Sequence, residues 1–189
     1  MKLSANLNFL FTEGGKPISE RIYMAHGAGF NAVEIPFPSS ELEDVLQAKE
    51  STGIQIGLIN ISLGDSKFGN GSVPNNQENF KKELKDTIEF AKKVRCTKIH
   101  IMAGLTEGDS NEHLVTYKSN LKYSANILEK EDMVGLIEPI NKYALPSYFM
   151  NSYETEINYK YNLYMNMYIS FSLSCSNWKL EHAEIPRAL

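Results

Sequence analysis

The sequence alternates between short apolar runs and longer amphipathic stretches, and this alternation limits the fold more than any other feature. The apolar runs are hydrophobic at successive positions, as parallel strands covered by helices tend to be. Five runs have this character: residues 3–7, 31–37, 54–60, 97–102 and 133–138. Regular alternation of strands and helices predicts an α/β fold with right-handed crossover connections.

Helical patterns fill the gaps between these runs. Residues 17–29 are expected to form a helix that closes at Gly27 or Gly29. The next helix begins with a capping box formed by Ser40 and Glu43 and ends at Gly53. Residues 78–94 and 111–132 repeat apolar side chains on one helical face.

The charged and histidine side chains of these helices are expected to face solvent. Lysines between residues 81 and 98 alternate with acids, which predicts a solvated helix face. The acids of that face are Glu83, Asp86 and Glu89. His26 and His113 also lie in helical patterns and are expected at the surface.

Two topologies fit the alternation, a (β/α)₈ barrel and an open doubly wound sheet. The turn after the first strand contains Gly14 and Gly15 but lacks the G-x-G-x-x-G pattern of a dinucleotide-binding sheet, which favours the barrel. A complete barrel needs about 250 residues and eight units. The sequence therefore predicts a partial TIM barrel of about five βα units, C-terminally truncated, whose first and fifth strands have unpaired edges.

Composition excludes several other classes of protein. The net charge of −4 gives no basic footprint for nucleic acid. Cys96 and Cys175 are too few for a disulfide framework and form no zinc pattern. The first eleven residues are too short and too polar for a signal peptide or a membrane span, so we expect a cytoplasmic protein without membrane contact.

Polar side chains occur at or near the carboxyl ends of the predicted strands, where the active sites of barrels lie. These residues are Asn6, Glu34, Asn60, His100 and Glu138. Burying an ionised carboxylate is costly unless it is paired, hydrogen-bonded or metal-bound, so Glu138 is either a solvated strand end or a placed chemical group. Glu34 allows both interpretations equally, and His100 is either an interior histidine or a group that contacts substrate.

Four segments that include or adjoin the predicted strands are specific enough to compare with known families: "GFNAVEIPFP", "LINISLGD", "KIHIMAG" and, most specifically, "YSANILEKEDMVGLIEPIN". They resemble the hydroxypyruvate isomerase family of xylose isomerase-like TIM barrels. The resemblance covers residues 1–156, which we expect to form one partial barrel domain. Residues 157–189 match no family motif and are expected to form a divergent tail.

The resemblance implies an isomerase of the aldose–ketose type, an intramolecular oxidoreductase. Family enzymes interconvert hydroxypyruvate and tartronate semialdehyde, which would place the protein in glyoxylate metabolism with a small hydroxy-keto acid as substrate. Glu138, in the "EPIN" motif, corresponds to a glutamate that is both a catalytic acid/base and a ligand of a divalent metal such as Mg²⁺. Asn6 and Asn60 match polar strand ends that face the substrate, and we include His100 as a third substrate-binding candidate.

The family's other metal ligands and its second catalytic glutamate belong to strands six to eight, which the tail does not match. We therefore expect this chain to have negligible isomerase activity. We also expect the tail to be translated non-family sequence, and a correctly spliced message that encodes it would contradict this. Two alternative functions remain open, a non-catalytic binding or dimerising partner and an endonuclease IV-like hydrolase. A homo-oligomer is compatible with each of these interpretations.

Overall fold

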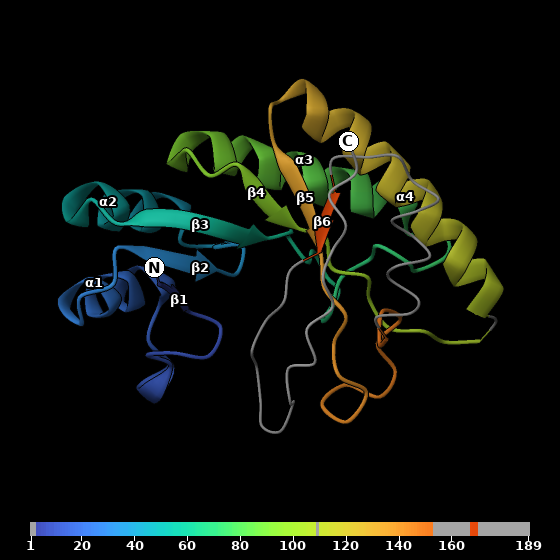
Figure 1. The fold of residues 1–189 in the computed structure, drawn as a ribbon, viewed down its shortest axis with the longest axis horizontal. Helices are drawn as coiled ribbons and strands as arrows, with labels where there is room; N and C mark the ends of the chain where they lie inside the picture. Colours follow the sequence, from blue (N-terminus) through green and yellow to red (C-terminus); the bar gives the residue numbers. More distant parts are fainter. Residues whose placement is uncertain (1–2, 109, 153–166, 170–189) are drawn as a thin grey trace, which may run out of the picture.

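The computed structural model describes residues 3–108, 110–152 and 167–169 of the 189-residue chain. Strands and helices alternate along this part of the chain (Figure 1). In chain order the elements are β1 Ser4–Asn6, a 3₁₀ turn Glu13–Gly15, α1 Ile18–Gly27, β2 Ala32–Ile35, α2 Leu42–Thr52, β3 Gln55–Asn60, α3 Gln77–Val94, β4 Lys98–His100, α4 Ser110–Lys130, β5 Val134–Ile137 and β6 Met167–Ile169. Each of the five predicted strands is confirmed within its expected range.

The strands form one parallel sheet in the order β1-β2-β3-β4-β5-β6. The spatial order equals the chain order, so the sheet has no point at which the winding direction reverses. A doubly wound sheet requires such a reversal, whereas a barrel is wound in one direction. The strands fan around the middle of the molecule in Figure 1, with the helices outside them. The fold is therefore α/β, with the winding of a TIM barrel.

A further strand, β6, follows the five predicted βα units and pairs in parallel with β5. This strand lies inside residues 157–189, the predicted divergent tail. Its three residues, Met-Tyr-Ile, include aromatic and β-branched types that suit a pleated strand. Consequently β5 is paired on both sides, and the expectation that the fifth strand has an unpaired edge is wrong. Among the described strands, β1 and β6 form the two ends of the sheet.

Helix α2 does not start with the predicted capping box. It begins at Leu42, and the N-cap residue is Glu41, which makes no side-chain capping bond. Glu41 instead accepts hydrogen bonds from the backbone N–H and hydroxyl of Ser19, each at 3.3 Å, and so connects α2 to the start of α1. Gly53 ends α2 in the left-handed conformation, as its position predicted.

The core lies between the strands and the inner faces of the helices. Val33, Ile59 and Ile99 on three successive strands are fully buried, as are Phe80 of α3 and Leu121 of α4. Burying one such aliphatic side chain contributes about 1.5–3 kcal/mol to folding stability relative to leaving it exposed.

None of the described helices combines the length and apolar composition that a membrane span requires.

The loop after β3 packs directly on the loop after β4 through backbone atoms. The N–H groups of Gly71 and Ser72 donate to the carbonyls of Met102 and Ala103, at 3.2 and 2.6 Å. A Cβ atom on Gly104 would lie 2.3 Å from the carbonyl oxygen of Gly69. A side chain at position 104 would overlap the backbone of Gly69, so glycine is required at this point of contact.

We predict that Gly104→Ala lowers the free energy of unfolding by about 3 kcal/mol, the sum of backbone strain at positive φ and overpacking. Gly108→Ala is the matched control, because Gly108 also has positive φ but nothing lies within 4 Å of its added Cβ. The control should cost only about 1 kcal/mol. Urea unfolding of both variants measures the difference, and equal losses would contradict the packing described for Gly104.

Candidate active site at the carboxyl ends of the strands

The five polar residues singled out in the sequence gather at one edge of the sheet. Asn6 and Glu34 are register partners on β1 and β2, and Asn60 and His100 are register partners on β3 and β4. Glu138 directly follows β5, whose Leu136 is the register partner of His100. Parallel pairing therefore brings residues up to 132 positions apart in the chain (138 − 6) to the same carboxyl edge of the sheet.

Asn6 and Glu34 form a side-chain pair at the first two strand ends. The Nδ2 group of Asn6 donates to Oε2 of Glu34 at 3.3 Å. The Oδ1 atom of Asn6 accepts from the backbone N–H and the side chain of Asn8, at 3.0 and 2.9 Å. Burial raises the pKa of Glu34, and the nearby charge of Lys98 opposes this. The amide of Asn6 therefore has internal partners on both of its polar atoms.

Asn60 and His100 form the second pair, deeper in the fold. The imidazole Nδ1 of His100 lies 3.4 Å from Oδ1 of Asn60. His100 is 5% exposed, and burial lowers its pKa to about 4, so the ring is neutral near pH 7. Because Oδ1 of Asn60 can only accept, the ring proton belongs on Nδ1 in this arrangement. The buried Nε2 atom is then an acceptor, and it has no hydrogen-bond partner.

Glu138 is followed by a loop that bonds back to the neighbouring strand ends. This loop, residues 139–152, bonds to the loop after β4 through Phe149 N–H to Gly104 O at 2.9 Å. Its Tyr148 is buried, and the Tyr148 hydroxyl accepts a hydrogen bond from the N–H of Ala103 at 2.8 Å. Burial raises the pKa of Tyr148, the hydrogen bond from Ala103 opposes this, and the charge of Glu138 adds a smaller rise. The loop thus places a neutral phenol within the electrostatic reach of the Glu138 carboxylate.

Two helical side chains are not at the surface, contrary to the sequence-based expectation. His113 of α4 is 2% exposed, and its ring contacts Ser72 at 3.5 Å and the carbonyl of Glu107 at 2.9 Å. Glu83 of α3 is 5% exposed. Both residues fall on the apolar faces of their helices when the periodicity is followed strictly, and this spacing is the signal that could have identified them. His26 is exposed, as predicted.

The described residues do not complete the donor set for the divalent metal that the family resemblance implies. Within residues 3–108, 110–152 and 167–169, no group of three or more His, Cys, Asp or Glu side chains could hold a metal ion. Glu138 would need donors from beyond this part of the chain. The metal-binding role of Glu138 therefore stays a prediction.

A pocket of about 520 Å³ lies beside this edge, between the start of α4 and the loop 139–152. It is lined by Thr106, Ser110, Asn111, Leu114, Pro146, Ser147, Tyr148, Phe149 and Asn151. None of the five strand-end residues lines it. Tyr148 belongs to both the pocket and the surroundings of the strand ends, because it lines the pocket and its phenol lies within the electrostatic reach of Glu138.

Comparison with known proteins agrees with this fold. The family model described as "Xylose isomerase-like TIM barrel" matches residues 22–156, and the chain belongs to this family. A crystal structure described as AP endonuclease, family 2, from Brucella melitensis superposes with a TM-score of 0.83 at 25% identity, covering 91% of this chain and 68% of that one. D-psicose 3-epimerase of Clostridium cellulolyticum H10 shares the fold at 14% identity, with a TM-score of 0.69 over 89% of this chain and 62% of that one.

Curated relatives carry the names of isomerases. A Drosophila melanogaster protein named "Putative hydroxypyruvate isomerase" is 48% identical over 158 residues, which cover 81% of this chain and 60% of the relative. Escherichia coli hydroxypyruvate isomerase is 33% identical over 79% of this chain and 60% of the relative. The 2-oxo-tetronate isomerase of Cupriavidus necator is 31% identical, over 79% of this chain and 59% of the relative. The chain thus spans about 60% of the length of these relatives.

We predict that the imidazole of His100 stays neutral down to about pH 4. An unfolded chain would protonate this ring near pH 6.5, so the unfolded state binds more protons between those pH values. Folding stability should therefore fall by about 3 kcal/mol as the pH drops through this window. The measurement is ¹⁵N NMR of the histidine rings together with urea unfolding at each pH.

Assignment of the NMR signal uses two variants. The ¹⁵N signal of the imidazole that stays neutral below pH 6.5 should disappear in His100→Gln. It should persist in His26→Gln, which alters only an exposed residue. Protonation of His100 near pH 6.5, or an unchanged pH dependence of stability in His100→Gln, would contradict the burial described here.

Proposed function

We propose that this chain carries part of an isomerase active site that interconverts hydroxypyruvate and tartronate semialdehyde. The observation that carries the proposal is the position of Glu138, a carboxylate at the end of β5 on the same sheet edge as the Asn60–His100 pair. The names of the relatives support the reaction class. Its place in glyoxylate metabolism and its cytoplasmic location are parts of the same proposal.

The reaction moves one proton between two neighbouring carbons. A base removes a proton from the hydroxymethyl carbon of hydroxypyruvate, and an acid adds a proton to the former carbonyl carbon. The hydroxyl proton moves between the two oxygens in the same process, so the substrate is rearranged without net gain or loss of atoms. Glu138 is suited to one of the two carbon proton transfers, because a carboxylate can act as a general base or a general acid.

The Asn60–His100 pair is suited to binding the two substrate oxygens. Neutral His100 offers Nε2 as a buried acceptor for a substrate hydroxyl group. The amide nitrogen of Asn60 is a donor that can polarise the carbonyl oxygen and stabilise the charge that develops there. Asn6 is less suited to direct binding, since both of its polar atoms have partners within the fold.

A nucleic-acid hydrolase is the second candidate that the comparisons raise, through the name of the Brucella melitensis protein. The net charge of −4 does not provide the positive surface on which phosphate binding depends. The curated relatives at 31–48% identity are named as isomerases. We therefore favour the isomerase.

The 189-residue chain itself is predicted to convert hydroxypyruvate negligibly, because Glu138 can serve one proton transfer and the other needs a second acid/base group. A chimera in which the chain continues after residue 156 with the remaining part of the Drosophila melanogaster relative is predicted to be active. In the chimera, Glu138→Gln should lower kcat at least about 100-fold, the usual contribution of general acid–base catalysis. Formation of tartronate semialdehyde, followed by ¹H NMR, measures the rate.

Glu50→Gln serves as the matched control, because Glu50 is an exposed carboxylate on α2, away from the strand ends. This variant should retain the chimera's rate within a factor of about two, as expected for a surface change. The proposal fails if the unmodified chain turns over hydroxypyruvate, or if the chimera keeps its rate in Glu138→Gln. A non-catalytic binding partner would show no turnover in either form.

A further inference from the structure

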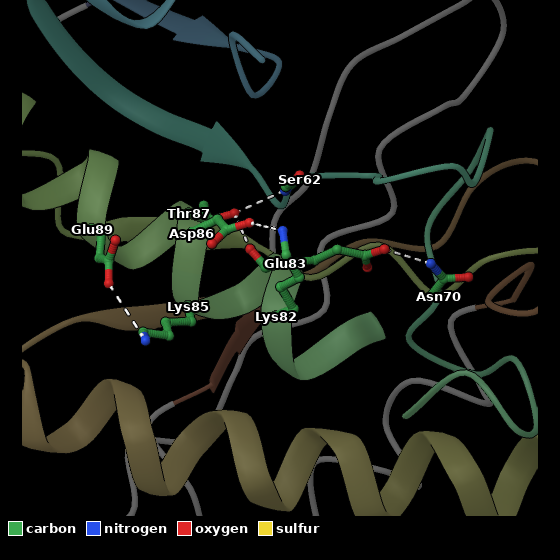
Figure 2. Close-up of polar contacts among 8 residues, drawn as sticks. All are labelled: Ser62, Asn70, Lys82, Glu83, Lys85, Asp86, Thr87 and Glu89. Carbon is green, nitrogen blue, oxygen red and sulfur yellow. Dashed lines mark hydrogen bonds and ion pairs between the residues drawn. The ribbon is translucent and has the colours of Figure 1, made fainter. Parts of the chain in front are cut away.

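Glu83 is a buried carboxyl group that the proposed reaction does not use. It lies in the second turn of α3, on the face that also buries Phe80, Leu84 and Thr87. The neighbouring charges of the same helix face solvent and pair with one another, as Lys82 does with Asp86 at 2.8 Å. Figure 2 shows the Glu83 side chain pointing away from these ion pairs toward Asn70. Its position among apolar residues therefore calls for a specific partner.

That partner is the loop after β3. The Glu83 Oε1 atom accepts a hydrogen bond from Nδ2 of Asn70 at 2.6 Å, and Asn70 is itself 5% exposed. The Oδ1 atom of Asn70 accepts from Nδ2 of Asn76 at 3.1 Å, next to the start of α3. Gly64 approaches the same carboxyl group so closely that a Cβ there would lie 2.6 Å from Oε1. One carboxyl group thus contacts both halves of the loop.

A second bond from the same helix holds the beginning of this loop. The Thr87 hydroxyl donates to the carbonyl of Glu83 at 2.7 Å and accepts from the N–H of Ser62 at 2.8 Å (Figure 2). Ser62 lies two residues after Asn60. The C-terminal half of the loop, at Gly71 and Ser72, donates backbone hydrogen bonds to the segment that follows His100. The position of this loop therefore affects both members of the Asn60–His100 pair.

The electrostatic surroundings favour a neutral carboxyl group. Burial is the largest influence and raises the pKa of Glu83, and the carboxylates of Asp65 and Asp86 act in the same direction. The Asn70 hydrogen bond and the charge of Lys82 oppose this shift. Glu83 Oε2 is buried and has no hydrogen-bond partner, which an ionised group would tolerate poorly. Glutamine should therefore be able to replace glutamate at this position.

We propose that Glu83 is a positioning residue of the strand-end site, which holds the loop after β3 in place by accepting the hydrogen bond of Asn70. Its effect on ligand binding rests on the proposed function, whereas its effect on the loop does not. Removal of the acceptor leaves the buried amide of Asn70 without this partner. The loop should then open more often while the rest of the sheet stays closed.

Hydrogen exchange of the full chain, followed by mass spectrometry, tests the proposal. Glu83→Leu should speed exchange in residues 61–76 about tenfold or more, the consequence of leaving one buried polar group unpaired. Peptides from α1 and β2 should change little. Glu83→Gln should restore exchange to within about twofold of the parent chain, because its side-chain oxygen can still accept from Asn70. Glu89→Leu, on the exposed face of α3, is the matched control and should leave residues 61–76 unchanged.

Several results would overturn this role for Glu83. The first two are an unchanged exchange rate of residues 61–76 in Glu83→Leu and an equal rise of the exchange rate over the whole chain. The third is an exchange rate in Glu83→Gln as high as that in Glu83→Leu. The fourth is that residues 61–76 are not protected from exchange in the parent chain. Titration of the same variants with hydroxypyruvate gives the second readout, and Glu83→Leu should weaken binding while Glu83→Gln restores it. If the parent chain binds no hydroxypyruvate, the proposed function fails while the exchange result still decides the role of Glu83.

Discussion

Consecutive strands of this sheet are hydrogen-bonded in parallel, so the chain must return to the same end of the sheet before each new strand begins. Helices α1 to α4 make these returns and cover the sheet from outside (Figure 1). As a result every strand from β1 to β5 ends at the same edge, and a polar residue at a strand end has polar neighbours from distant parts of the sequence. The pairs Asn6–Glu34 and Asn60–His100 arise in this way.

The loops at that edge give the strand ends a fixed environment. The loops after β3 and β4 meet backbone to backbone at Gly69 and Gly104, and the loop 139–152 bonds to the second of them. Burial then alters the chemistry of the enclosed groups, since it keeps His100 neutral and raises the pKa of Tyr148. These effects depend on packing between loops, and the same residues on an open sheet would behave as ordinary solvated groups.

The sequence predicted the strands, the helical faces and the strand-end positions, because each depends on a local pattern of apolar residues. It failed for Glu83 and His113, whose spacing fits the apolar helical faces but whose polar character was taken as a sign of exposure, and for Tyr148. Glu83 was assigned to a solvated face from its charged neighbours, but Asn70, thirteen residues earlier, provides the partner that allows its burial. His113 is buried for a similar reason, through contacts with Ser72 and Glu107. Tyr148 lies in a loop without periodicity, so no local signal indicates its contact with Ala103.

The central claim is that the carboxyl ends of β3, β4 and β5 form the surface that binds a small hydroxy-keto acid. The most direct measurement is a ¹H–¹⁵N NMR titration of the labelled chain with hydroxypyruvate. We expect saturable shifts in the backbone and side-chain signals of Asn60, His100 and Glu138. Shifts confined to the pocket between α4 and residues 146–151, or no shifts at any concentration, would contradict it.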